Sequence, residues 1–215
     1  MTGVLSLHAS IGRIRRGSGS FATTVSACFQ GYNTEMNNLF LQEKPTRMEM
    51  VDVTVYYLEM IAPSDRVVPA PRSGLSVVNV ESPTVPYYRS LYDAVGKEFY
   101  WLSRRRMSDE ALAAILSDSG NEMHILVVDG TPAGFAELDR RRPDEIELVQ
   151  FGLIREFIGQ GLGKWFLQWT IDKAWSYRPK RFWLHTCTLD HPNALPTYTK
   201  AGFVLYKQES IRREL

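Results

Sequence analysis

The sequence is poor in cysteine, long apolar runs and surplus charge, and each shortage excludes a class of protein. Its two cysteines, Cys28 and Cys187, are too few for a disulfide framework and lack metal-ligand spacing, so we expect reduced thiols and no metal. No run of about 18 apolar residues is present, so we expect no membrane partner. The formal net charge of +1 gives no overall field that would attract nucleic acid. These shortages predict a cytoplasmic globular protein.

Acidic residues are missing from the start of the chain. Residues 1–34 contain no Asp or Glu, although they carry Arg13, Arg15 and Arg16 among many Ser, Thr and Gly. This composition is typical of an organellar transit peptide. An over-long translation start, with the compact protein opening near Met48, gives the same pattern and is the reading we favour. We predict an N-terminal extension, residues 1–47, that is poorly ordered and takes no part in chemistry, followed by one domain, residues 48–215.

Hydropathy periods predict the elements of that domain. Alternation of apolar and polar residues predicts strands, and apolar residues three to four apart predict helices. The expected strands are 51–59, 75–80, 123–128, 133–139, 145–153, 182–188 and 203–207. The expected helices are 83–96, 108–116, 162–175 and 192–201, and a proline-containing loop spans 61–72. This order predicts an α+β fold with a mixed sheet.

A glycine-rich loop joins a predicted strand to a predicted helix between Phe151 and Lys164. The N-terminus of a helix exposes unpaired N–H groups and a partial positive charge, which favour a phosphate. The glycines at 159, 161 and 163 let the backbone approach an anion, and Lys164 adds a cation. The simplest alternative is a turn that only packs the helix on the strand.

Two common phosphate motifs do not fit this loop. The dinucleotide fingerprint G-x-G-x-x-G would need glycine where Lys164 stands. The nucleotide P-loop would need glycine at Ile158 and a hydroxyl at Trp165. The loop does resemble the acetyl-CoA signature Q/R-x-x-G-x-G/A of the GNAT superfamily of N-acetyltransferases. Gly161 and Gly163 match its glycine positions, whereas Ile158 departs from the usual Gln or Arg.

A second segment, residues 188–203, is similar to the closing motif of the same superfamily. Its pattern, close to N-x-x-A-x-x-x-Y-x-K-x-G-F, is matched at five positions, while His191 replaces the usual Asn and Asn193 lies two residues on. The matching residues are Ala194, Tyr198, Lys200, Gly202 and Phe203. The resemblance covers about residues 51–207 and implies a GNAT-type fold for the domain at residues 48–215. Its central sheet is mixed and mostly antiparallel, flanked by helices and splayed between the strands around 146–153 and 182–188.

The same resemblance implies acetyl-CoA as co-substrate. Phosphate contacts in this family come mainly from backbone amides of the loop. The residues expected to bind the co-substrate are Phe151, Gly152, Leu153, Ile158, Gly159, Gln160, Gly161, Leu162, Gly163, Lys164 and Asn193.

Candidate chemical roles follow from what acetyl transfer requires. Tyr198 stands where these enzymes often carry the tyrosine that protonates the leaving thiolate, and the N–H of Leu153 is the candidate for stabilising the oxyanion. Glu147 is the candidate base, on a face that alternation assigns to Glu147, Val149, Phe151 and Leu153. Glu137 is the alternative base, with His185 or His191 behind it. Each carboxylate could equally be a solvated or ion-paired strand residue.

The acceptor is expected beside the connection between the first two helices, where Trp101 with Arg104 or Arg105 could line a pocket and attract a carboxylate. Glu137 is included in this substrate set. We expect direct acetyl transfer to an amine of a small molecule or peptide. The rival class is a non-catalytic acyl-CoA-binding or sensor protein. The strand at 203–207 or the segment 208–215 could serve a homodimer.

Overall fold

The computed structural model describes residues 50–215, which form one seven-stranded sheet with helices on both faces. The prediction for residues 1–47 lies outside the described residues. The strands are β1 (Met50–Met60), β2 (Leu75–Val80), β3 (Asn121–Val128), β4 (Thr131–Asp139), β5 (Glu145–Leu153), β6 (Arg181–Cys187) and β7 (Val204–Glu214). The helices are α2 (Val85–Gly96), α3 (Ser103–Arg106), α4 (Asp109–Leu116), α5 (Leu162–Ser176) and α6 (Ala194–Ala201). Short 3-10 turns occur at Lys97–Phe99 and Arg155–Phe157.

The expected elements are present, and local chemistry explains where several of them start and stop. Thr84 and Ser108 accept hydrogen bonds from the first turns of α2 and α4 through their hydroxyl groups. Gly202 takes a left-handed conformation, with φ of 108°, at the end of α6. Asp129 and Gly130 both have positive φ values in the hairpin between β3 and β4, as a tight primed turn requires.

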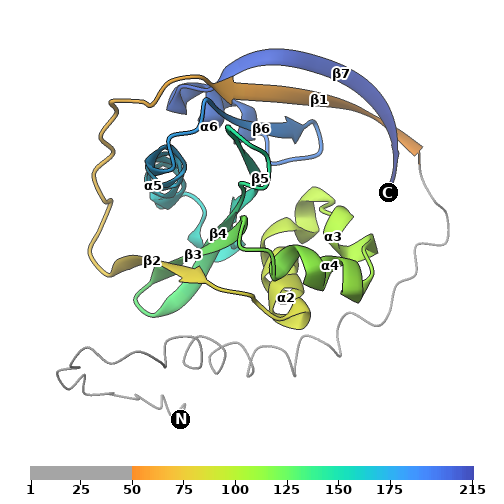
Figure 1. Cartoon of the computed structure of the whole chain (residues 1–215), viewed down its shortest axis with the longest axis horizontal. Coiled ribbons are helices and arrows are strands. Elements are labelled where there is room, and N and C mark those ends of the chain that lie inside the picture. Colours follow the sequence, from red (N-terminus) through yellow and green to blue (C-terminus); the bar gives the residue numbers. More distant parts are fainter. Residues whose placement is uncertain (1–49) are drawn as a thin grey trace, which may run out of the picture.

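The last strand is longer than predicted. The predicted strand ended at residue 207, with 208–215 expected to be a tail, but β7 continues to Glu214. Its polar residues show no clear alternation, and the strand forms because it pairs antiparallel with β1 along nearly its whole length, from Glu59–Val204 to Met50–Glu214. The β1 strand thus lies between β6 and β7, although it begins the domain. Figure 1 shows both strands curving together toward α3.

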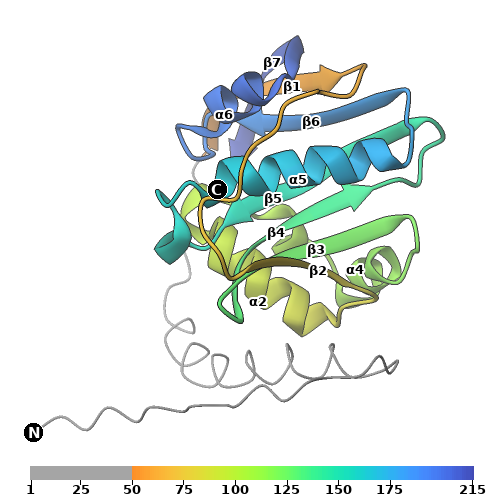
Figure 2. The same ribbon diagram turned by 90° about the vertical axis from the view of Figure 1, so that its left-hand side faces the viewer.

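Each face of the sheet covers its own hydrophobic core. One core packs α5 and α6 against the sheet through side chains such as Phe166, Phe182 and Phe203. The other packs α2 and α4 against β3 and β4 through side chains such as Tyr88, Leu112 and Phe135. Figure 2 shows α5 and α6 in front of the sheet and α2 and α4 behind it. The expected α+β class and the flanking helices are confirmed.

Candidate active site

The sheet opens where β5 and β6 separate. These two parallel strands pair from Glu145–Arg181 to Leu148–Leu184 and no further, although β5 continues to Leu153 and β6 to Cys187. The predicted splay is therefore present. The N–H of Ile154 donates to the carbonyl of Ala133 at 2.8 Å, toward β4. Because N–H groups alternate between the two sides of a strand, the N–H of Leu153 points to the open side.

A β-bulge at Val149 changes the face that was assigned to Glu147. Leu138 pairs with Leu148 and Glu137 with Gln150, so Val149 is an extra residue opposite β4. Phe151 consequently shares the α5 face with Leu148. The predicted alignment of Glu147 with Val149, Phe151 and Leu153 on one face is wrong, because alternation holds only while the ladder has no bulge.

The glycine loop brings an α-helix N-terminus to the mouth of the splay. Gly159 and Gly161 have φ values of 84° and 78°, which L side chains rarely adopt. A Cβ atom at Gly159 would meet nothing within 4 Å, so glycine is needed there for conformation and not for space. Gly161 is the N-cap of α5 and offers no side chain to that helix end. The N–H groups of its first turn are available to an anion.

A cavity of about 700 Å³ runs along this opening. It is lined from β5 and the loop by Phe151, Gly152, Leu153, Ile158, Gly159, Gly161, Gly163 and Lys164, and from the following segments by His185, Asp190, Asn193 and Tyr198. Two expected contacts lie outside the lining. Leu162 is fully buried in the α5 core, and the Gln160 side-chain amide donates to the carbonyl of Glu156 at 2.8 Å. Ile158 is 40% exposed at the mouth.

Tyr198 brings a protonated phenol to the cavity wall. Its ring is 9% exposed and packs edge-on against Phe151, with centroids 6.3 Å apart. Burial raises the pKa of Tyr198 well above the ordinary value, and the charge of Asp190 adds to the shift. The phenol therefore keeps its proton throughout the neutral range.

Glu147 lies next to His185 and does not itself line the cavity. His185 lines the cavity, whereas Glu147 does not. The two lie on neighbouring strands, with Glu147 Oε1 3.5 Å from His185 Nδ1. The cavity is therefore lined by the imidazole, and the carboxylate lies next to its Nδ1 atom.

Asp190 joins three residues of the cavity wall by accepting hydrogen bonds from them. Its Oδ2 atom accepts hydrogen bonds from the Thr186 hydroxyl at 2.6 Å and the Cys187 N–H at 2.9 Å. Its Oδ1 atom accepts the indole N–H of Trp101 at 3.3 Å. Trp101 thus lines the cavity and is held there by Asp190, a residue with no role in the predictions from sequence.

Comparison with known proteins agrees with this geometry. The sequence profile of the acetyltransferase (GNAT) family matches residues 88–203, which is more than half of the chain. The chain belongs to the GNAT family. The matched region runs from α2 to the start of β7 and includes the splay, the glycine loop and Tyr198. No curated protein matches the sequence.

Solved structures share the GNAT fold at low identity. A functionally unknown conserved protein from Staphylococcus epidermidis superposes with a TM-score of 0.52 at 18% identity, over 82% of this chain and 63% of its own. A GCN5-related N-acetyltransferase from Kribbella flavida gives 0.50 at 15%, over 76% and 58%. Another from Sphaerobacter thermophilus gives 0.51 at 14%, over 89% and 68%. The chain thus spans about 60% of the length of the first two. These similarities show a shared fold and no more.

Two members of the expected substrate set lie inside the GNAT domain and away from its cavity. Glu137 is 0% exposed, and its Oε1 atom lies 2.5 Å from the Arg104 guanidinium. The Tyr88 hydroxyl donates to the other oxygen of the same carboxylate. Neither Glu137 nor Arg104 lines the cavity. Arg105 pairs with Asp93 at 2.5 Å, so it is held on the helix pair as well.

The arginines that do line the cavity are Arg106 and Arg213, which the sequence analysis missed. Arg106 follows Arg104 and Arg105 in one basic run. The three side chains leave α3 in different directions because each helical residue is rotated from the one before it. Arg213 lies in the segment that was taken for a tail. The pairing of that segment with β1 was the missing information.

Between residues 50 and 215, no helix is long and apolar enough to cross a membrane. The same residues contain no group of three or more His, Cys, Asp or Glu side chains placed to hold a metal ion.

Proposed function

We propose that residues 48–215 catalyse transfer of the acetyl group of acetyl-CoA to an amine of a small molecule or peptide. The observation that carries this proposal is a single cavity that joins the helix N-terminus, the open strand edge at Leu153 and the buried phenol of Tyr198. Each of these features supplies one thing that acetyl transfer needs, and membership of the GNAT family makes acetyl-CoA the natural donor.

The donor fits the cavity by its chemistry. A pyrophosphate suits the first turn of α5, where backbone N–H groups, the glycines and Lys164 converge. An extended amide chain suits the unpaired edge of β5, which can form the hydrogen bonds that β6 does not supply beyond Leu148. These contacts would bring the thioester to the widest part of the splay, beside Leu153 and Tyr198.

Transfer then proceeds directly from the thioester to the amine, by addition to the acetyl carbonyl and loss of the thiolate. The amine nitrogen attacks the thioester carbon, and the N–H of Leu153 stabilises the negative oxygen that develops. The C–S bond breaks as the tetrahedral adduct collapses to the amide. The leaving sulphur takes the phenolic proton of Tyr198, and the amine gives up one proton to a base. Tyr198 is reprotonated from solvent.

His185 is the base that we propose for the amine proton, with Glu147 as its positioning residue. The imidazole lines the cavity, and the carboxylate 3.5 Å behind it favours the tautomer with a proton on Nδ1. Glu147 was itself the candidate base, but the side chain that touches the cavity is the histidine.

Direct transfer is favoured over an acetyl-cysteine intermediate. Cys187 lines the cavity, but burial and the Asp190 carboxylate raise the pKa of its thiol. The reactive form of cysteine is the thiolate, and a raised pKa makes that form scarce at neutral pH. The amine therefore attacks acetyl-CoA itself in a ternary complex.

The test compares the wild type with Tyr198→Phe. Calorimetry measures acetyl-CoA affinity, and thiol release measures turnover across amines, polyamines, amino acids and peptide N-termini. We expect Tyr198→Phe to bind acetyl-CoA within a few-fold of wild type and to lose about 100-fold or more in kcat. The matched control is Tyr206→Phe, at an exposed tyrosine of β7 outside the cavity lining. Acetyl-CoA binding without acceptor-dependent release would instead identify a sensor, and absence of binding would overturn the proposal.

A further inference from the structure

We infer that the acceptor amine carries a carboxylate, and that Arg106 and Arg213 bind it. This inference rests on the proposed acetyl transfer, because it concerns the second substrate of the same cavity. The class of acceptor is an amino acid or a short peptide whose free carboxylate lies at a distance from the amine that is acetylated.

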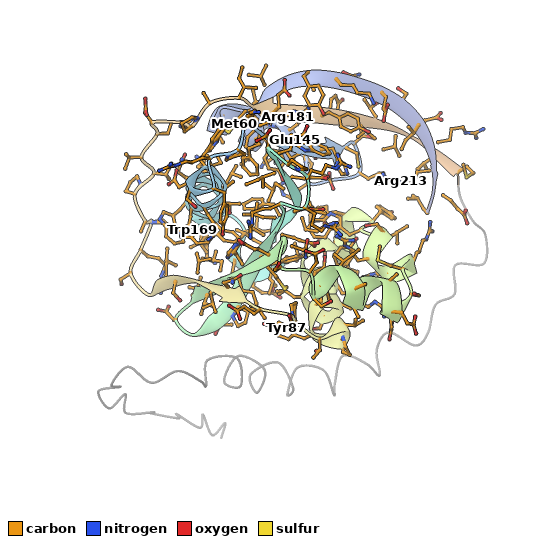
Figure 3. The ribbon with its side chains drawn as sticks, in the orientation of Figure 1. Met60, Tyr87, Glu145, Trp169, Arg181 and Arg213 are labelled. Atoms are coloured by element: carbon orange, nitrogen blue, oxygen red, sulfur yellow. The ribbon has the colours of Figure 1, made fainter. Side chains whose placement is uncertain are left out.

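Both arginines line the cavity, and they reach it from opposite sides. Arg106 ends α3, and Arg213 comes from the far end of β7. The Arg106 guanidinium donates to the carbonyl oxygen of Glu214 at 3.3 Å, which places it beside the residue that follows Arg213. Figure 3 shows Arg213 on the inner side of the curve of β7, toward the helices. Arg106 thus contacts the backbone of β7 one residue after Arg213, and both side chains line the same cavity.

Neither cation is neutralised within residues 50–215. The Arg106 contact is to a neutral carbonyl, and Arg213 Nη1 lies 3.9 Å from the sulphur of Cys187. By contrast, the neighbours Arg104 and Arg105 each pair with a carboxylate, Glu137 and Asp93. The same short helix therefore pairs two arginines and leaves the third facing the cavity. A planar guanidinium is well suited to a carboxylate, because two parallel N–H groups match its two oxygens.

The cavity lining includes one acidic side chain, Asp190, and it accepts hydrogen bonds from other residues of the wall. Asp190 is the only carboxylate among the residues that the structure places around the cavity, and it accepts hydrogen bonds from Trp101, Thr186 and the Cys187 backbone. The end of the cavity near Arg106 and Arg213 has two guanidinium groups that form no ion pair with a side chain of residues 50–215. Such an end favours an anionic ligand and disfavours a polyamine.

The arginines also lie on the acceptor side of the splay. Arg106 belongs to α3, which contacts α2 on one face of the sheet, whereas the glycine loop leads into α5 on the other face. Ser103 and Tyr92 line the cavity between these regions, and their hydroxyl groups lie 3.1 Å apart. An acceptor anchored by its carboxylate at the arginines would extend toward the thioester from the side opposite CoA.

The experiment measures turnover of matched pairs of acceptors, amino acids and dipeptides against the same compounds as C-terminal carboxamides. The proteins are the wild type, Arg106→Gln, Arg213→Gln, Arg213→Lys and the control Arg212→Gln. Arg212 neighbours Arg213 on β7, but its side chain is 72% exposed and lies 3.6 Å from Asp52 outside the cavity. Acetyl-CoA affinity is measured for every variant by calorimetry.

We expect the wild type to prefer each carboxylate over its carboxamide by about 10- to 100-fold in kcat/KM, as expected for loss of a charged hydrogen-bonded partner. Arg106→Gln and Arg213→Gln should lose that preference through KM, Arg213→Lys should keep part of it, and Arg212→Gln should keep all of it. Acetyl-CoA affinity should stay unchanged throughout.

Two results would overturn the inference and leave the proposed function standing. One is equal turnover of carboxylates and carboxamides by the wild type, and the other is an unchanged preference in both glutamine variants. Acetyl-CoA binding with no turnover of any carboxylate-bearing amine also counts against it. Failure of acetyl-CoA to bind the wild type is a separate result, and it removes the proposed function itself.

Discussion

The indole N–H of Trp101 donates to the carboxylate of Asp190 at 3.3 Å, which joins the segment after α2 to the loop after β6. The ring of Trp101 lies in the cavity wall and packs 5.2 Å from that of Tyr92. A Cβ atom at Gly152 would collide with Val95 and lie 3.6 Å from the indole, so the small residue in β5 leaves room for this packing. One hydrogen bond thus connects Trp101, in the cavity wall, to the loop that precedes Tyr198.

We predict that this connection contributes to stability as well as to the site. Asp190→Ala removes the acceptor of three hydrogen bonds and should lower the free energy of unfolding by about 2–3 kcal/mol. Trp101→Phe should cost about 1–2 kcal/mol, partly through lost packing. Urea denaturation of the single and double variants gives the coupling, which we expect to be about 1 kcal/mol. Strictly additive effects of the two substitutions would show that the indole and the carboxylate act independently.

The second prediction separates His185 from Glu147 as the base. His185→Gln should lower kcat/KM by about 100-fold or more. Glu147→Gln should lower kcat/KM less, because the imidazole remains. His191→Gln is the matched control, since His191 also lines the cavity but its Nδ1 accepts the N–H of Asn193 at 3.0 Å. A larger loss in Glu147→Gln than in His185→Gln would return the role of base to the carboxylate.

Local spacing was enough to predict the fold and the glycine loop that lines the cavity. The glycine loop, the helix that follows it and the tyrosine of α6 are each defined within about 16 residues of sequence. Their positions follow from turn chemistry and helical periodicity, which are short-range. The sequence of helices and strands along the chain followed in the same way, but the place of β1 between β6 and β7 in the sheet did not.

The acceptor side depends on contacts between distant residues, which one sequence does not contain. Arg104 and Arg106 belong to one basic run, and only the packing of α3 on the sheet decides that the first is buried against Glu137. Arg213 reaches the cavity through the pairing of β7 with β1. The bulge at Val149 has no signal in the composition of β5, yet it reverses the face of every later residue.

A third prediction concerns the buried pair of Arg104 and Glu137. Glu137→Ala should lower the free energy of unfolding by about 3–5 kcal/mol, because it leaves the guanidinium buried without its carboxylate. The double variant Arg104→Met with Glu137→Leu should recover much of that loss, since it removes both charges. Urea denaturation measures both, and the affinity of the folded variants for acetyl-CoA should match the wild type. A double variant no more stable than Glu137→Ala would indicate that the ion pair has a further structural role.

The last prediction concerns acid stability and Glu122. Burial of Glu122 opposes its ionisation, but hydrogen bonds with His124 and Tyr177 and the charges of Arg140 and Lys173 outweigh burial and lower its pKa to about 2. A carboxyl whose pKa is lowered on folding stabilises the protein above the unfolded value of 4.5, and this contribution is lost as the pH falls toward 2. The shift corresponds to about 3 kcal/mol. Urea denaturation between pH 6 and about pH 2 should therefore give a flatter dependence of stability on pH for Glu122→Gln than for wild type. Glu110→Gln, at an exposed carboxylate of α4, should keep the wild-type slope, and an unchanged slope in Glu122→Gln would contradict this assignment.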